Sequence, residues 1–196
     1  MRLRLNRRHW LGTAMAATAG PLLAQPAQAW SIAIVPQFPP AKLLRSWSPL
    51  LERLERDTGC RLVLRLPPSI PRFEAEVLAG QVDFAYLNPY HQLMARRAQG
   101  FIPMVRDSQP LSGILVVRQD SPITTVQALE GQTLAFPAPN AFGASLYMRA
   151  LLTEKAHLQF QSKYVKTHSN VFRHVISGQV VAGGAIRHTL EKESAD

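Results

Sequence analysis

The stretches VLAGQVDFA (residues 77–85) and VISGQVVAG (residues 175–183) share one pattern: an apolar pair, a small residue, Gly-Gln-Val and a β-prone run. The glycine is typical of a helix end, and the valine after it opens a strand. A helix–glycine–strand unit that occurs in each half of the chain predicts two α/β units. Asp83 becomes Val181 in the second copy, and we expect this difference to reflect local capping and solvation.

Strand-like and helix-like segments alternate around these two stretches. β-Prone runs are followed by segments with apolar residues at helical spacing, and several of these end at a glycine. We expect strands at 32–35, 61–66, 82–87, 133–139, 161–167 and 180–186, and helices at 41–59, 70–80, 88–100, 140–156, 168–178 and from 187. Such alternation builds right-handed βαβ units and predicts an α/β fold with parallel-dominated sheets flanked by helices.

The middle of the chain holds two more β-prone runs, FIPMVRD at 101–107 and SGILVVRQD at 112–120. The second run, continued to residue 122, is our candidate for the crossing between two lobes. We therefore divide the chain into a leader at 1–29, lobe one at 30–115 and an incomplete lobe two at 116–196.

The first 29 residues are typical of an export signal. Four arginines precede a short apolar stretch that Gly20 and Pro21 interrupt, and AQA at 27–29 matches a cleavage site. This stretch is too short to span a bilayer, so we expect a periplasmic protein with no stable membrane anchor. The segment NRRHWLG at 6–12 resembles a twin-arginine signal, and ordinary export stays open.

The charge of the chain bears on its partners. Of 22 basic residues the leader takes four, which leaves 18 against 13 acidic ones and a net charge of about +5. This net charge argues weakly for an anionic partner, or it reflects only a solvated basic surface. The basic residues are scattered, which argues against nucleic acid. The single cysteine, Cys60, cannot form an internal disulfide, and its place before an apolar run predicts a buried side chain. We expect a monomer.

In open α/β sheets, ligands bind beyond the carboxyl ends of the strands. The loops there are 37–40, 67–70, 88–91, 138–145, 167–170 and 186–189. The candidate ligand-binding residues on or beside these loops are Phe38, Tyr86, Asn88, Tyr90, His91, Asn140, Phe142, Gly143, Ser145, His168 and Ser169.

Three of these positions have a structural alternative. The turn APNAFGAS at 138–145 opens a helix whose free N–H groups suit an anion, or it is a plain connection with Asn140 as N-cap. His168 donates to an oxyanion, or it is exposed while Ser169 or Asn170 caps the helix. Tyr86 contacts the ligand, or it packs in the core.

Signals for catalysis and for metal binding are weak. The chain contains no HExxH, CxxC or Gly-x-Ser-x-Gly motif, and Glu74 and Glu76 point apart on one helix. An enzyme that used His168 or His91 as base would lack a nucleophile. We therefore predict no catalytic residue, no metal site and no cofactor.

Four segments carry a resemblance to a known family: WSPLLERLERDTG at 47–59, VLAGQVDFAYLNPY at 77–90, the run 115–145 and THSNVFRHVISGQV at 167–180. Residues 30–196 resemble the phosphate/phosphite/phosphonate-type substrate-binding proteins of ABC transporters. The resemblance implies a type II periplasmic-binding-protein fold, in which two lobes close over a ligand, and a transporter permease as partner. It also implies that the turn at 139–145 holds an oxyanion near His168 and near aromatic residues of lobe one.

The chain departs from the family pattern in composition and in length. Ala141, Phe142 and Ala144 stand where members often have serine or threonine, and Asn88 stands where they often have glycine. The chain ends where members return to lobe one, so it resembles a C-terminally truncated member whose return segment is missing. A ligand-sensing accessory protein for a membrane kinase and a remnant without function stay open as alternatives.

Overall fold

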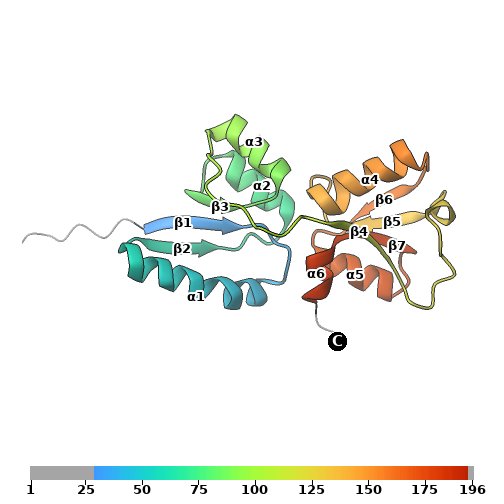
Figure 1. The fold of residues 1–196 in the computed structure, drawn as a ribbon, viewed down its shortest axis with the longest axis horizontal. Helices are drawn as coiled ribbons and strands as arrows, with labels where there is room; N and C mark the ends of the chain where they lie inside the picture. Colours follow the sequence, from blue (N-terminus) through green and yellow to red (C-terminus); the bar gives the residue numbers. More distant parts are fainter. Residues whose placement is uncertain (1–28, 194–196) are drawn as a thin grey trace, which may run out of the picture.

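The computed structural model describes residues 29–193. The predicted leader lies outside these residues except for Ala29, with which the first strand begins. Within the described range, no helix is both long and apolar enough to cross a membrane. The described chain forms two α/β lobes that lie side by side (Figure 1).

Lobe one (residues 29–100) contains a parallel sheet in the order β2-β1-β3. Helix α1 covers one face, and α2 and α3 cover the other (Figure 1). This follows from right-handed crossovers, because β2 and β3 lie on opposite sides of β1. The elements are β1 (Ala29–Ile34), α1 (Pro40–Thr58), β2 (Arg61–Arg65), α2 (Ile70–Leu78), β3 (Phe84–Tyr86) and α3 (Pro89–Gln99).

Lobe two (residues 113–193) contains a sheet in the order β4-β7-β5-β6, with β4 antiparallel to β7. Its first helix is one continuous helical run at 142–155, most of it with π-type hydrogen bonding. The elements are β4 (Gly113–Val117), η1 (Val126–Leu129), β5 (Thr133–Phe136), η2 (Phe142–Tyr147), α4 (Met148–Ala150), η3 (Leu151–Lys155), β6 (Gln161–Tyr164), α5 (His168–Ile176), β7 (Ala182–Ile186) and α6 (Arg187–Glu191).

The repeated Gly-Gln-Val pattern has the same local structure in both lobes. Gly80 and Gly178 have φ of 68° and 71°, a left-handed conformation that glycine adopts at low cost. The N–H groups of Gln81 and Gln179 each donate 3.0 Å hydrogen bonds to the carbonyl five residues back. This pattern ends a helix in a Schellman motif, so the predicted helix–glycine–strand units are confirmed.

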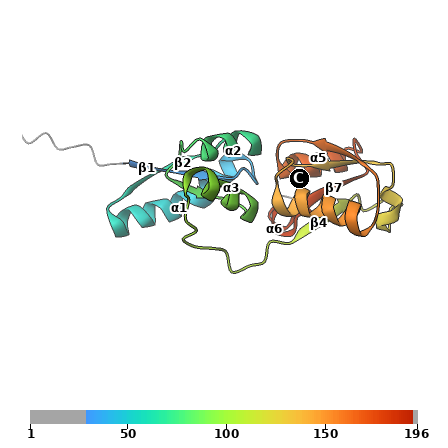
Figure 2. The ribbon, with the colours of Figure 1, turned by 90° about the horizontal axis from the view of Figure 1, so that it is seen from above.

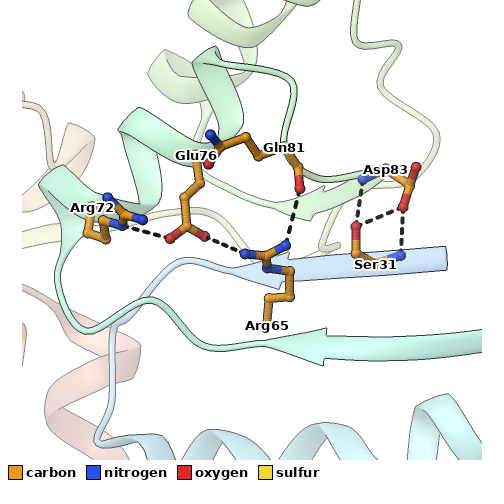
Figure 3. A network of polar contacts seen from close by, with 6 residues as sticks. All are labelled: Ser31, Arg65, Arg72, Glu76, Gln81 and Asp83. Atoms are coloured by element: carbon orange, nitrogen blue, oxygen red, sulfur yellow. Dashed lines mark hydrogen bonds and ion pairs between the residues drawn. The ribbon is translucent and has the colours of Figure 1, made fainter. Parts of the chain in front are cut away.

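Asp83 acts locally, as expected. Its carboxylate accepts 2.7 Å hydrogen bonds from the N–H and from the hydroxyl of Ser31 on β1, and this hydroxyl accepts a 3.0 Å bond from the Asp83 N–H (Figure 3). The hydrogen bonds from the Ser31 N–H and hydroxyl lower the pKa of Asp83. Asp83 thus ties the start of β3 to β1, on the amino side of the strands.

The segment between the lobes differs from the sequence prediction. Residues 101–107 form no strand, and the run predicted to cross between the lobes forms β4 in the second sheet instead. The predicted lobe boundary at 115–116 lies inside β4. The connection therefore consists of residues 100–112, which Figure 2 shows as a loop along the outside of the molecule. Its Ile102, Met104 and Val105 are 76 to 93% exposed.

The two lobes share an apolar contact. Ala138, Ala141, Ala144 and Ile186 of lobe two are buried in one cluster with Val35, Ile70 and other core residues of lobe one. The rest of lobe two has two clusters of its own, one on each face of its sheet. The apolar contact brings the carboxyl ends of β1 and β7 together.

Candidate functional site

A small hollow that is partly open to solvent lies between the lobes, and we call it the interlobe cavity. It is placed where strand ends of both lobes meet, as expected for an open α/β fold. Its lining residues are Val35, Gln37, Ile70 and Asn88 of lobe one, Leu111 of the connection, and Ala141, Phe142, Gly143, Ala144, His168 and Ile186 of lobe two.

A helix start without a side-chain cap lies at this cavity. The N-cap of the helical run at 142–155 is Ala141, and no side chain caps it. The first N–H groups of a helix have no partner within the helix. The N–H groups of Phe142, Gly143 and Ala144 are therefore available at the cavity, and the positive end of the helix dipole favours an anion there.

Three other helix starts at the cleft are capped. Ser69, Asn88 and Thr167 each accept a hydrogen bond from a backbone N–H of the first turn of α2, α3 and α5, respectively. The interpretation of Asn140 as N-cap is wrong, because its side-chain amide reaches Glu74 of lobe one at 3.4 Å. The start at Ala141 thus differs from these three, whereas the starts of α1 and α6, at Pro39 and Ile186, also lack a side-chain cap.

Close packing holds the uncapped turn in place. A Cβ atom added to Gly184 on β7 would lie 2.1 Å from the carbonyl oxygen of Ala144, and one added to Gly113 on β4 would lie 2.3 Å from that of Gly143. Real Cβ atoms do not approach a backbone oxygen so closely. The two strand glycines therefore let the turn lie directly against the sheet, with its carbonyls toward the strands.

His168, the first residue of α5, also lines the cavity. The alternative that it is merely exposed is wrong, because its side chain is 3% exposed and Thr167 caps the helix. Its Nδ1 is buried without a hydrogen-bond partner. Burial lowers the pKa of His168 to about 4, so at neutral pH the ring is an uncharged imidazole that can donate one hydrogen bond and accept another.

A second small hollow, also partly open to solvent, lies against α2 and α3, and we call it the α2–α3 cavity. Here His91 Nε2 lies 2.7 Å from Glu74 Oε1, and the other carboxylate oxygen of Glu74 accepts the bond from Asn140. His91 is 4% exposed. Glu74 therefore links a buried histidine of lobe one to an amide of lobe two.

The predicted site residues divide among these places. Asn88, Phe142, Gly143 and His168 line the interlobe cavity, whereas Tyr90, His91 and Asn140 line the α2–α3 cavity. Ser145 and Ser169 are buried, with hydroxyls that have no partner. Phe38 and Tyr86 line neither cavity.

The two aromatic residues outside the cavities have local contacts. The Lys42 ammonium lies 4.4 Å from the centre of the Phe38 ring. The Tyr86 ring packs edge-on against Trp47 at a centroid distance of 4.9 Å. Burial, with a smaller contribution from Asp107, raises the pKa of Tyr86.

Sequence reasoning missed most of the apolar lining. Gln37, Ile70 and Ile186 lay within loops that were singled out, although none of the three was named as a candidate. Val35 and Leu111 lay outside these loops and look like ordinary strand and loop residues. No sequence signal marks them as cavity residues. Among the residues that the structure describes, no three His, Cys, Asp or Glu side chains come together as a metal site would require.

The family model for the periplasmic substrate-binding protein of phosphonate ABC transporters matches residues 32–196. The chain belongs to this family. A comparison with curated proteins finds no match.

Solved structures show the same fold. A binding protein component of an ABC phosphonate transporter from Pseudomonas aeruginosa has a TM-score of 0.71 at 16% identity, over 84% of this chain and 59% of that one. PhnD1 from Prochlorococcus marinus, in complex with methylphosphonate, has a TM-score of 0.74 at 13% identity, over 83% and 65%. The BvgS VFT2 domain of Bordetella pertussis has a TM-score of 0.57 at 20% identity, over 83% and 68%. The chain thus spans about 59 to 65% of the length of the first two.

Proposed function

We propose that this protein is the exported solute-binding component of an ABC importer, and that a small oxyanion, phosphate-like or phosphonate-like, binds in the interlobe cavity. The observation that carries the proposal is the uncapped helix start at 141–144, whose free N–H groups line that cavity. A buried, uncharged His168 with an unpartnered nitrogen lines the same cavity and gives independent support.

Binding would couple the two lobes. Gln37 and Asn88 approach the cavity from lobe one, and Phe142 to Ala144 and His168 approach it from lobe two. A ligand that bonds to both sets stabilises the arrangement in which the lobes are together, by selecting it or inducing it. The ligand-bound form is then the one that a transporter permease would recognise, with the protein acting as a monomer.

The sensing alternative concerns the partner rather than the site. The fold alone does not distinguish a permease from a membrane kinase as the partner. Co-purification from a membrane extract distinguishes them: we expect a permease, and a kinase in its place would support sensing.

The proposal is tested first by a thermal-shift screen. Phosphate, phosphite, alkylphosphonates, alkylsulfonates and carboxylates are added at millimolar concentration to the protein. At least one tetrahedral oxyanion should raise the melting temperature, because a ligand that binds only the folded state stabilises it. No shift with any of these anions would contradict the proposal.

A proline substitution then tests the helix start itself. Phe142→Pro removes one N–H at the first helical position, where proline is tolerated, and Ala141 before it already has a compatible φ of −68° and ψ of 98°. A lost hydrogen bond to a charged group corresponds to roughly ten- to hundredfold weaker binding. The matched control Phe142→Ala keeps the N–H and should bind much more tightly than the proline variant. Equal affinities for the two variants would remove the helix start from the site.

A further inference from the structure

The chemistry of the interlobe cavity restricts the class of ligand further. Among residues 29–193, none of those that line it carries a charged side chain at neutral pH, since burial keeps His168 uncharged. The cavity thus has neither a basic side chain to balance a second negative charge nor a carboxylate to pair with a cation.

Its polar groups serve mainly as donors. The N–H groups at 142–144 can only donate. The Asn88 carbonyl oxygen already accepts a 2.9 Å bond from the His91 N–H, which leaves the donor Nδ2 and one lone pair of the oxygen for a ligand. A helix start has a positive partial charge of about half an elementary unit. This set suits one negative charge, because a second one would be desolvated without compensation.

The rest of the lining is apolar. Val35 and Ile70 contribute from lobe one, Leu111 from the connection, and Phe142 and Ile186 from lobe two. Apolar walls around a few convergent donors fix the orientation of a ligand that has a polar head and an apolar tail. A ligand that is polar on every side would leave some of its groups unpaired against these walls.

We propose that the interlobe cavity selects singly charged tetrahedral oxyanions with a short alkyl substituent, namely alkylsulfonates and singly ionised alkylphosphonates. Doubly charged inorganic phosphate and phosphonates that bear an ammonium group are disfavoured. This inference rests on the proposed function and adds the charge and the substituent of the ligand.

Calorimetry with four probes tests the selectivity: ethanesulfonate, ethylphosphonate, inorganic phosphate and 2-aminoethylphosphonate. We expect ethylphosphonate to bind roughly tenfold or more tightly than 2-aminoethylphosphonate, because the residues that line the cavity give the ammonium group no carboxylate as a partner. Ethanesulfonate should bind more tightly than phosphate above neutral pH.

The pH dependence isolates the charge of the ligand. Ethanesulfonate carries one charge throughout, so any change in its affinity reports titration of the protein, including Glu74, His91 and His168. The affinity of ethylphosphonate relative to ethanesulfonate should rise as the pH falls through the second ionisation of the phosphonate. A ratio that falls instead would show that the cavity prefers the dianion.

A single isosteric substitution should reverse the preference. Gln37→Glu places a carboxylate on the lining with almost no change in size, and the wild-type glutamine is its neutral control. The affinity ratio of ethanesulfonate to 2-aminoethylphosphonate should fall by about tenfold or more. If anions bind but phosphate is preferred, the proposed selectivity is wrong. It is also wrong if the affinity ratio is the same in the variant as in the wild type. In both cases the proposed function still stands. If no anion binds at all, both proposals fail.

Discussion

The two lobes start from the same helix–glycine–strand unit and give it different surroundings. In lobe two the unit leads into β7, which is buried along its whole length between β4 and β5. In lobe one it leads into β3, an edge strand with Phe84 and Tyr86 37 to 39% exposed. The comparison teaches that the local pattern sets where the helix ends, whereas the neighbouring strands set how deeply the next strand is buried.

The largest expected effect comes from Gly184 of β7, which corresponds to Tyr86 of β3 when the two units are aligned. Gly184→Ala would place a Cβ 2.1 Å from the Ala144 carbonyl oxygen and 2.6 Å from the Phe136 ring. We expect a loss of about 3 kcal/mol in the free energy of unfolding, measured with urea. Tyr86→Ala, at the exposed edge, should cost only about 1 kcal/mol. Equal losses would show that the lobes do not differ in this way.

A second contrast concerns the last turn of the helix before the glycine. The Glu76 carboxylate, 9% exposed, accepts a 2.8 Å bond from Arg72 and lies 3.7 Å from Arg65 on β2 (Figure 3). The ring of the corresponding His174 hydrogen-bonds to the carbonyl oxygen of Asn170, within its own helix, at 2.8 Å. Glu76→Ala should lower the free energy of unfolding by about 2 kcal/mol in chemical denaturation, because it removes the bridge between α2 and β2. His174→Ala should lower the free energy of unfolding by less. A larger loss for His174→Ala than for Glu76→Ala would show that the bridge does not stabilise lobe one.

Asp83 and Val181 give a smaller, pH-dependent contrast. Because hydrogen bonds lower the pKa of Asp83, its contribution is present above the unfolded-state pKa and is lost as the pH falls through the lower folded-state value. At neutral pH, Asp83→Asn should cost under about 1 kcal/mol, since the side chain is exposed and solvent screens it. This difference from wild type should shrink in urea titrations below the ordinary pKa of 3.8. A difference that persists in acid would mean that the carboxylate charge is not its source.

The smallest effect is expected in the connection. Val105 is 93% exposed, so Val105→Lys should change the free energy of unfolding by no more than about 0.5 kcal/mol. Urea titrations of the variant and of the wild type measure this change. A large loss of stability would show that Val105 is buried in solution.

Much of the fold could be predicted because local chemistry determines it. Gly59, Gly100 and the two Gly-Gln-Val glycines end helices where expected. The run at 101–107 is β-prone but forms no strand, because a strand also needs a partner with free backbone groups. That partner is not encoded in the run itself.

The candidate site could be predicted only in part. Asn88 and His91 lie one helical turn apart, yet Asn88 faces the interlobe cavity and His91 faces Glu74. Asn88 is the N-cap of α3 and has an extended backbone, so its side chain does not share the helix face on which His91 lies. The available N–H groups of 142–144 followed from the helix pattern, but the apolar walls depend on how the two lobes pack.

Cys60 was expected to be buried and is exposed. It is also the only cysteine in the sequence, and it follows α1 in lobe one. The natural chain can therefore carry one fluorophore or spin label at a defined place without removal of any other thiol. A single cysteine added to lobe two would complete a pair of labels, and the distance between them would report the movement of the lobes when an anion is added.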